Sequence, residues 1–542
     1  MERLKKLKQI SNEILFWIIT FVVTVVLFIT VKPHLHTELG WARKGVVAQS
    51  VAGVIIFLVV IVALFLSAYK KLNAKTITIC LIIIGFALRV GYMLITPAAT
   101  RQHDTFTKNF DGHEAYAWTI YSTNRLPKTN IYQFYHPPLN ALFQAGFMHF
   151  FSGLTDLLTT LFGLGDYFAT EFLIGKPDYI DGERFLLYSS CQILSVMYSM
   201  VACVYSIKII KAFGFSNKVN LLLYAFVILF PRNIQISAQL NNDTLSYTLS
   251  ILALFTCVKW FKCGKKHLYI YLCAIFAGLG MMTKLSSATI CLPIAVVFIY
   301  EFIRSIVCKK DIGKIICQYI IFLIICAPIG LWFQVYAKIK FDQNFGFVFS
   351  NLNGELSTKQ HSIFSRFIFA SDLEEWFGSL FAMPFDHYNL FLYLTRTSVF
   401  GEFSYWQGES FGLVALASAY LACGVIIIDI IYCLIALIVK RAKKQITFKA
   451  IFRKFGDILF MVSLILSQVV SMYYFYIKMP YGCTMDFRYI LPMILGLALG
   501  LGYIFKTFKL IGGNTAKILT CSTLALIVVF ITSSAGFYMM CV

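Results

Sequence analysis

Runs of about 20 apolar residues recur along the whole 542-residue chain, and they leave few folds open to it. A helix of this length spans the hydrocarbon core of a bilayer, and it satisfies all of its backbone hydrogen bonds internally. Only 13% of the residues are charged, against about 25% in an ordinary soluble protein. The sequence therefore predicts an all-α polytopic membrane protein.

About thirteen transmembrane helices are expected, together with two long polar loops. The loops cover residues 96–185 and 338–410, and the first contains short amphipathic or apolar pieces such as 139–152. The predicted spans lie near residues 14–31, 46–68, 75–95, 186–209, 218–236, 243–261, 266–283, 285–303, 315–336, 411–439, 456–476, 488–506 and 516–540.

The net charge of +21 comes mostly from short Lys and Arg clusters between the apolar runs, where such clusters set membrane topology. If the basic N-terminus is cytoplasmic, these clusters fall in the predicted inside loops, the strongest from Lys440 to Lys454. The loop at 32–45 conflicts with this assignment, because it places Lys32, Arg43 and Lys44 outside. Both long loops are predicted to face away from the cytoplasm. No basic domain lies outside the predicted spans, so nucleic acid is not an expected partner.

The stretch from Arg101 to Leu139 gathers most of the residue types that could carry chemistry. Carboxylates beside imidazoles at a membrane surface suit general-base catalysis or the binding of a divalent metal. The acidic and imidazole side chains here are His103, Asp104, Asp111, His113, Glu114 and His136. The candidate metal ligands among them are Asp104, Asp111, His113 and Glu114. The Pro137-Pro138 pair cannot continue a helix, and it would aim the preceding Tyr135 and His136.

Two of these residues also have a purely structural explanation. Asp111 as N-cap and Glu114 three residues into a helix would form a capping box. That explanation accounts for neither Asp104 nor the histidines, so both interpretations stay open.

The order of motifs in this loop resembles the GT-C membrane glycosyltransferases. An Asp-containing external loop is followed by Glu114-Ala115-Tyr116, then by Leu126-Pro127, and then by Phe134-Tyr135-His136-Pro137-Pro138-Leu139. The resemblance is to the bacterial branch of glycosyltransferase family 39, which is related to protein O-mannosyltransferases and aminoarabinose transferase. It implies a GT-C-like bundle with a catalytic unit at residues 75–510, two additional helices at 1–74 and a C-terminal helix at 511–542.

Three later stretches resemble further motifs of this family, and all fall on the predicted outside. They contain Asn242 with Asp243, Thr283 with Lys284, and Arg488 with Tyr489. Each has a plainer interpretation. The Asn242-Asp243 pair could cap a span, Lys284 could snorkel from a helix end, and Arg488 could pair with Asp486 or with lipid headgroups.

The second long loop is less informative. A stretch from Thr397 to Glu402 resembles related bacterial sequences, and Glu402 or Arg396 could contact a substrate. Either could equally belong to a surface ion pair. Asp372, Glu374 and Glu375 are interpreted as a solvated acidic turn.

The resemblance implies an inverting transferase that moves a sugar from a polyprenyl phosphate to a hydroxyl of a cell-envelope acceptor. It implies a bacterial plasma membrane, with the reaction at the outer face. Asp104 or Asp111 would be the base. Asp104 is preferred because it lies closest to the end of the preceding span, where the family's loop carboxylate usually sits. Asp111 leads directly into the Glu114-Ala115-Tyr116 stretch that resembles the family's motif, but His113-Glu114 replaces the family's adjacent Asp-Glu pair there. The donor phosphate would be held by Lys284, Arg488, Tyr489 and His136. The supporting residues would be His103, His113, Glu114, Tyr135, Asn242, Asp243 and Glu402.

Two other functions remain open. A transporter or flippase of lipid-linked sugars would need charged residues near mid-membrane and internal repeat symmetry. A non-catalytic envelope-assembly protein that only binds glycolipid would transfer no sugar, and its binding would survive the loss of both Asp side chains.

Overall fold

The computed structural model describes residues 2–33, 41–173, 176–308, 312–347, 357–367, 388–403, 405, 408–443 and 455–541. Within these ranges every secondary-structure element is an α-helix or a short 3-10 helix. The single β contact among the described residues is an isolated bridge between Ser357 and Tyr481. The prediction of an all-α membrane protein is confirmed. The proposed acidic turn at Asp372, Glu374 and Glu375 lies outside the described residues.

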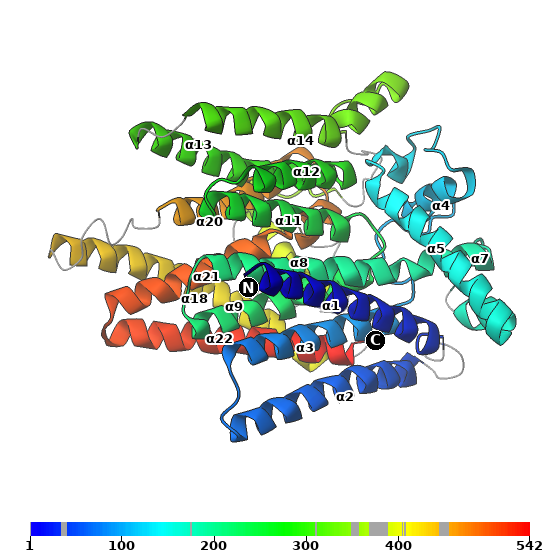
Figure 1. The fold of residues 1–542 in the computed structure, drawn as a ribbon, viewed down its shortest axis with the longest axis horizontal. Helices are drawn as coiled ribbons and strands as arrows, with labels where there is room; N and C mark the ends of the chain where they lie inside the picture. Colours follow the sequence, from blue (N-terminus) through cyan, green and yellow to red (C-terminus); the bar gives the residue numbers. More distant parts are fainter. Residues whose placement is uncertain are drawn as a thin grey trace.

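The long helices are side by side and bury a continuous core (Figure 1). They are α1 (Glu2–Thr30), α2 (Trp41–Ala68), α3 (Ala74–Ile95), α8 (Gln192–Ala212), α11 (Asp243–Lys262), α12 (His267–Thr283), α13 (Cys291–Val307), α14 (Ile312–Phe341), α18 (Glu409–Ala442), α20 (Phe455–Lys478), α21 (Met493–Ile511) and α22 (Gly513–Met540).

Ten helical segments of the described chain are long and apolar enough to cross a membrane, or eleven with one bent pair. The expected number of thirteen is not confirmed. Two predicted spans are not among these segments: α12 has 17 residues, and in the 28-residue α2 the fully described apolar part is Ala52–Ala68. A helix of about 20 residues is needed to span the hydrocarbon core.

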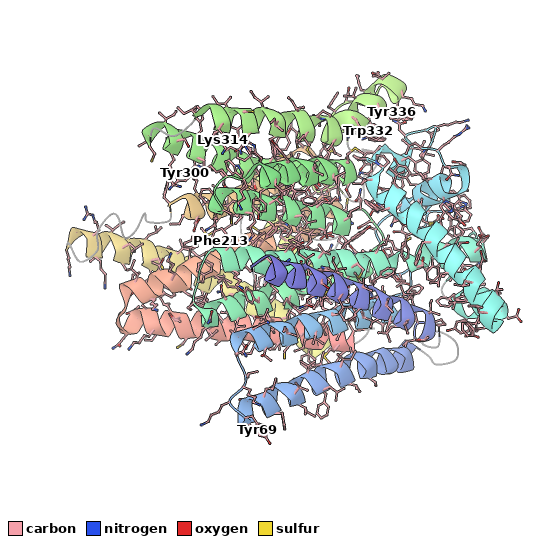
Figure 2. The ribbon with its side chains drawn as sticks, in the orientation of Figure 1. Tyr69, Phe213, Tyr300, Lys314, Trp332 and Tyr336 are labelled. Carbon is pink, nitrogen blue, oxygen red and sulfur yellow. The ribbon has the colours of Figure 1, made fainter. Side chains whose placement is uncertain are left out.

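The helices of the first long loop gather at one end of the bundle, which we call the loop end (Figure 1). They are α4 (His113–Thr123), α5 (Leu139–Phe162), α6 (Gly165–Thr170) and α7 (Gly182–Ser190), with a 3-10 turn, η1 (Tyr132–Tyr135), between α4 and α5. In α14, Trp332 and Tyr336 lie toward the loop end and Lys314 toward the opposite end (Figure 2).

The apolar piece expected at 139–152 is longer in the structure, because α5 continues for 24 residues to Phe162. The helix starts directly after the Pro137-Pro138 pair, which fixes its entry. It stops where Gly163 adopts a positive φ of 67°, a conformation that glycine reaches without a Cβ penalty.

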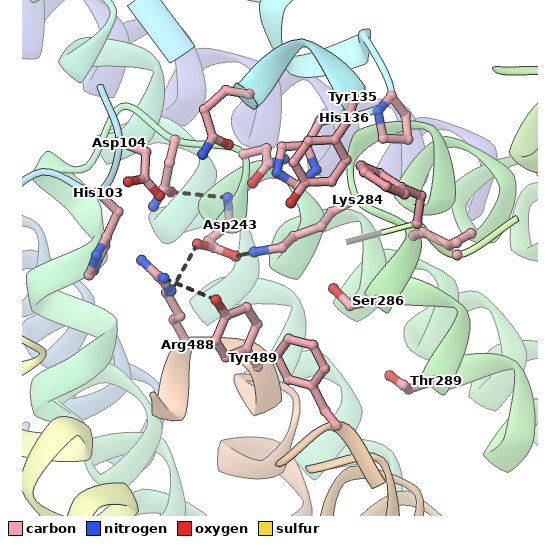
Figure 3. A pocket seen from close by; sticks show the side chains of 18 of the residues that line it. His103, Asp104, Tyr135, His136, Asp243, Lys284, Ser286, Thr289, Arg488 and Tyr489 are labelled. Carbon is pink, nitrogen blue, oxygen red and sulfur yellow. Dashed lines mark hydrogen bonds and ion pairs between the residues drawn. The ribbon is translucent and has the colours of Figure 1, made fainter. Parts of the chain in front are cut away.

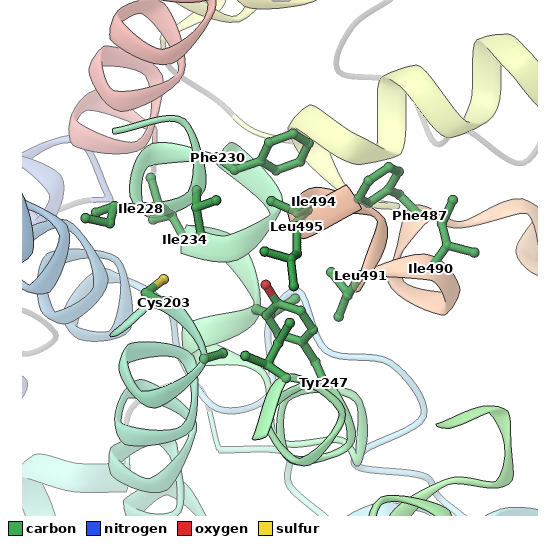
Figure 4. Close-up of a cluster of buried hydrophobic side chains, with 14 of the residues drawn as sticks. Cys203, Ile228, Phe230, Ile234, Tyr247, Phe487, Ile490, Leu491, Ile494 and Leu495 are labelled. Atoms are coloured by element: carbon green, nitrogen blue, oxygen red, sulfur yellow. The ribbon is translucent and has the colours of Figure 1, made fainter. Parts of the chain in front are cut away.

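The span predicted at 218–236 is broken rather than continuous. Helix α9 (Asn217–Leu229) and helix α10 (Pro231–Gln235), followed by the turn η3 (Ile236–Ala238), meet at an angle of 48°. Pro231 has no amide hydrogen and disfavours the helical conformation at Phe230, whose ψ is 125°. At this break Phe230 lies in an apolar cluster and stacks on Phe487, with the ring centroids 5.6 Å apart (Figure 4).

Lys32, one of the residues that conflicts with the predicted topology, is not an exposed loop charge. Its amine is buried and donates hydrogen bonds to the carbonyls of Met93 (2.8 Å) and Thr96 (2.9 Å) and to Gln192 Oε1 (2.5 Å). A lysine used internally in this way carries little topological information. The other two residues of the conflict, Arg43 and Lys44, have side chains outside the described part of the structure.

Candidate active site at the loop end

A cavity of about 300 Å³ opens at the loop end, where the first long loop meets the helix ends (Figure 3). Its wall combines the loop with residues that follow the broken span, with Lys284 and the turn η4 (Leu285–Ile290) after α12, and with parts of α14 and α20. Ten residues that the sequence singles out line it: His103, Asp104, His113, Tyr135, His136, Asn242, Asp243, Lys284, Arg488 and Tyr489. Asp111, Glu114 and Glu402 do not line it.

The floor of the cavity is a buried ion cluster around Asp243 (Figure 3). Lys284 Nζ lies 2.5 Å from Asp243 Oδ1, and Arg488 Nε lies 3.9 Å from Asp243 Oδ2. Both cations make cation–π contacts with the ring of Tyr489, with Lys284 at 4.7 Å and Arg488 at 5.0 Å from its centroid. Lys284 therefore does not snorkel to the surface: its side chain is only 12% exposed, and a buried ammonium needs such a partner.

Arg488 is buried but its hydrogen-bonding capacity is incompletely used. Nη2 donates to Tyr489 Oη at 3.0 Å, whereas Nε has no hydrogen-bond partner. The nearest oxygens of its acidic neighbours Asp243, Glu402 and Asp486 are all 3.7 to 3.9 Å away. The plainer interpretation that Arg488 pairs with Asp486 is confirmed as an ion pair, although 3.7 Å is too long for a direct hydrogen bond from the guanidinium. A guanidinium held in this state is suited to a planar or tetrahedral oxyanion.

The polar residues ahead of α11 do not cap that helix as the plainer interpretation supposed. The helix begins at Asp243, and the side chain of Asn242 makes no capping hydrogen bond. Asn242 Nδ2 instead donates to the carbonyl of Thr283 at 3.4 Å, and Asn241 Oδ1 accepts from the amide of Asp243 at 3.1 Å. The Asn242 contact joins the start of α11 to the end of α12, where Asp243 meets Lys284.

The wall above this floor is uncharged. The rings of His113 and His136 stack 5.7 Å apart with an interplanar angle of 16°. Burial lowers the pKa of His113 to about 4, although Asp104 opposes the shift, and burial holds the pKa of His136 well below its ordinary value. Both imidazoles are therefore neutral near pH 7, and together with Asn241 they offer the donors and acceptors that sugar hydroxyls need.

Asp104 is an exposed carboxylate at the edge of this wall. It adopts a positive φ of 50° and accepts a hydrogen bond from Tyr132 Oη at 2.5 Å. The carbonyl of Asp104 accepts the amide of His113 at 2.9 Å, which ties the loop to the start of α4. Gly112 permits this approach, because a Cβ there would lie 2.2 Å from the carbonyl oxygen of Thr105.

The carboxylates of Asp111 and Glu114 in the same loop bind other residues and do not line the cavity. Asp111 Oδ1 accepts a hydrogen bond from the Thr107 hydroxyl at 2.7 Å. Glu114 is buried and forms an ion pair with Arg184, whose Nη2 lies 2.8 Å from Glu114 Oε2. The capping-box interpretation is wrong, since the N-cap of α4 is Gly112 and it has no side-chain hydrogen bond. The Glu114 carboxylate does not reach back to the start of α4, because it is paired with Arg184 from a distant part of the loop.

Behind the cavity lies a second buried cluster that the sequence patterns did not reveal as a unit. Arg232 Nη2 donates to both oxygens of Asp486, at 2.8 and 2.7 Å. His103 lies between two acidic side chains, with Nδ1 3.3 Å from Glu402 and Nε2 3.6 Å from Asp486. Burial keeps the pKa of His103 well below its ordinary value, and Arg488 lowers it further.

The surface-ion-pair alternative for the second loop is also wrong. Glu402 is buried and accepts a hydrogen bond from Tyr393 Oη at 2.6 Å, and Arg396 is buried as well. Arg396 lies in α17 (Leu390–Phe400) and Glu402 follows the end of that helix. Helix α17 packs on α10 and on the turn η8 (Phe487–Ile490).

Arg232 is the main residue that the sequence patterns failed to single out. A signal was present, because an ionisable residue inside an apolar span is a candidate functional residue, and Pro231 marks the break beside it.

The predicted metal ligands do not come together as a set. Among the described residues, the group close enough to share an ion is instead His103, Glu402 and Asp486, with ligand atoms within 4.8 Å of one another. This group fits a divalent cation poorly. Arg232 already takes both oxygens of Asp486, and Arg488 lies 3.9 Å from Glu402, so two guanidinium charges would repel the ion.

Comparison with known proteins gives a family match and a similarity to solved structures. Residues 182–332 match the family model described as dolichyl-phosphate-mannose-protein mannosyltransferase. No curated protein matches the chain. The crystal structure of ArnT from Cupriavidus metallidurans bound to undecaprenyl phosphate is similar, with 10% identity, a TM-score of 0.41, and coverage of 84% of this chain and 76% of that one. A likeness of this degree carries none of the argument below. Over residues 182–332 the chain is therefore similar to this mannosyltransferase family, which confirms the resemblance to the GT-C membrane glycosyltransferases that its loop motifs predict.

Proposed function

We propose that the protein is an inverting glycosyltransferase that moves one sugar from a polyprenyl phosphate to a hydroxyl of a cell-envelope acceptor. The observation that carries the proposal is the contrast within the cavity. Lys284 and the under-bonded guanidinium of Arg488 form a cationic floor, below a neutral polar wall and the exposed carboxylate of Asp104. A phosphate, a sugar and an attacking hydroxyl need these three environments in this order.

The donor would bind with its phosphate on the floor and its sugar against the wall. Lys284 and Arg488 supply charged donors to the phosphate, and Tyr489 holds both cations in place. A cavity of about 300 Å³ is at the lower end for small-molecule sites, so it suits a single sugar residue. The polyprenyl tail would leave the cavity into the lipid.

The reaction follows as one displacement. Asp104 accepts the proton of the acceptor hydroxyl, whose oxygen forms a bond to the anomeric carbon. The bond from that carbon to the phosphate oxygen breaks, and the polyprenyl phosphate leaves with the electron pair. The phosphate changes from a diester with one negative charge to a monoester with up to two. Lys284 and Arg488 stabilise the charge as it develops, which is where fixed charges contribute most to rate.

The proposal includes the orientation of the protein. The N-terminus would be cytoplasmic and the loop end would lie at the outer face of a bacterial plasma membrane. Residues 75–510 would form the catalytic unit. What supports this orientation is the excess of Lys and Arg at the opposite ends of the helices, for example Lys211, Lys262 and Lys440.

A comparison of cell-envelope glycans tests the proposal. Mass spectrometry of envelopes from cells with the gene, without it, and with only the Asp104→Asn variant should show one sugar substituent present in the first and missing in the other two. A substituent that persists in the deletion, or one that the Asp104→Asn variant restores fully, would contradict transfer by this site.

Glu402 gives a prediction for the pH dependence of donor binding. Burial raises the pKa of Glu402 to about 8, and Asp486 adds to the shift while Arg488 opposes it. The carboxyl is therefore mainly protonated at pH 7 and ionises as the pH rises through 8. The new negative charge lies 3.9 Å from Arg488 and competes with the phosphate for it.

The apparent Kd for undecaprenyl phosphate should consequently rise about tenfold between pH 7.5 and 9 in the wild-type protein. The Glu402→Gln variant should show a flat profile over this range, which separates Glu402 from the titration of Lys284. An equal rise in both proteins would assign the pH dependence to another group.

A further inference from the structure

We propose that Arg232 and Asp486 act as a positioning pair that keeps Arg488 available to the phosphate. Arg232 occupies the Asp486 carboxylate, so that this carboxylate orients Arg488 without neutralising it. The inference deepens the proposed function and rests on it.

The pair is completely buried and makes a two-bond contact. Arg232 and Asp486 are both 0% exposed, and Arg232 Nη2 donates to the two carboxylate oxygens at 2.8 and 2.7 Å. Arg232 Nη1 donates to Gln235 Oε1 at 2.6 Å. The partners are 254 residues apart in the chain, so the contact joins the broken span α9–α10 to the turn η8 before α21.

Asp486 contacts Arg488 mainly through the backbone. Asp486 Oδ1 accepts the Arg488 amide at 2.9 Å, while Asp486 Oδ2 stays 3.7 Å from Arg488 Nε. The first contact fixes the turn on which Arg488 sits. The second is longer than a charged hydrogen bond, which is normally about 2.7–2.9 Å. The carboxylate is held back because Arg232 already binds both of its oxygens.

The break in the span brings Arg232 to this position. Pro231 ends the regular helix, and the freed carbonyls receive side-chain donors: Arg89 Nη2 binds Ile228 O at 3.0 Å and Asn233 Nδ2 binds Val227 O at 2.9 Å. On the other side Gly401, with a φ of 66°, leaves room for the guanidinium, because a Cβ there would lie 2.0 Å from Arg232 Nη1.

Without Arg232 the free carboxylate would draw Arg488 into a direct ion pair. Charged groups in a buried site find the nearest opposite charge, since an unpaired buried charge is costly. Arg488 would then be lost to the phosphate. Removal of the Asp486 charge in the same protein should release Arg488 again, and a residue with a purely structural role would not produce this rescue.

The test measures the Kd of undecaprenyl phosphate for the full chain in lipid nanodiscs. Arg232→Gln should weaken binding by about tenfold or more, and the double variant Arg232→Gln with Asp486→Asn should return to within about threefold of wild type. Arg232→Lys, which keeps the buried charge, should lie between wild type and Arg232→Gln. The matched control is Asp457→Asn, which breaks a partly buried pair with Lys262 at the opposite end of the bundle and should bind like wild type.

The contradicting results are equally specific. If the double variant binds no better than Arg232→Gln, or if Arg232→Gln binds like wild type, the positioning role is wrong. Unfolding temperatures measured on the same samples identify any variant that fails to fold, and the Lys substitution then provides the comparison. If the wild-type protein itself binds no undecaprenyl phosphate, the proposed function fails and this inference fails with it.

Discussion

Replacement of Asp104 by Asn is expected to lower sugar transfer by about 10²–10⁴-fold, the range that a positioned general base contributes. The side chain is an exposed carboxylate on the cavity wall, and its hydrogen bond from Tyr132 Oη orients it without occupying both oxygens. Asn keeps the size of the side chain and cannot accept the proton. Binding of undecaprenyl phosphate should change by less than about threefold, since Asp104 is not part of the cationic floor.

The matched control is Asp111→Asn in the same loop. Asp111 is bonded to Thr107 and does not line the cavity, so its loss should reduce transfer by only a few fold, through the stability of the loop. Initial rates and the Kd of undecaprenyl phosphate would be measured for both variants. A large loss of transfer with Asp111→Asn, and none with Asp104→Asn, would reverse the assignment of the base.

The second large effect is expected at Lys284. Lys284→Gln removes a charged donor from the phosphate and leaves Asp243 without its 2.5 Å partner. A hydrogen bond to a charged group is worth about 1.5–3 kcal/mol, so the affinity for undecaprenyl phosphate should fall by about 10- to 150-fold. The unpaired carboxylate adds repulsion to this loss, and transfer should fall at least as much as binding does.

The control for Lys284 is another cation of the loop end. Lys338 pairs with Asp342 at 2.6 Å, but both side chains are exposed, and exposed pairs contribute little. Lys338→Gln should therefore bind undecaprenyl phosphate like wild type. Equal losses in the two variants would mean that the general positive charge of this end, rather than the buried floor, attracts the lipid.

Most of the membrane architecture could be predicted from the sequence, because hydropathy acts locally along the chain. Apolar length alone locates the long spans, and the ends of those spans place Asp243, Lys284 and Arg488 on a common side. Hydropathy does not predict the bend at Phe230. That bend follows from the backbone chemistry of a single residue, Pro231, inside a run that is otherwise apolar.

Which acidic residue of the loop faces the cavity, and which are paired with other residues, could not be predicted for a different reason. Asp104 and Asp111 are seven positions apart in one polar loop, and the sequence favours Asp104 only through its position nearer the preceding span. The structure separates them through distant partners. Arg184 takes Glu114, and Gly112 lets the loop fold onto the start of α4 so that Asp104 faces the cavity. Long-range pairs of this kind, like Arg232 with Asp486, exist only once the helices have packed.

The most direct test of the central claim is transfer by the purified protein in lipid vesicles. Vesicles would contain synthetic undecaprenyl-phosphate sugars of defined anomeric configuration, and an envelope extract would supply the acceptor. The account predicts that free undecaprenyl phosphate appears in step with the glycosylated product, that the product has the inverted configuration, and that Asp104→Asn abolishes both. Binding of the donor without release of undecaprenyl phosphate, or a product with retained configuration, would contradict it.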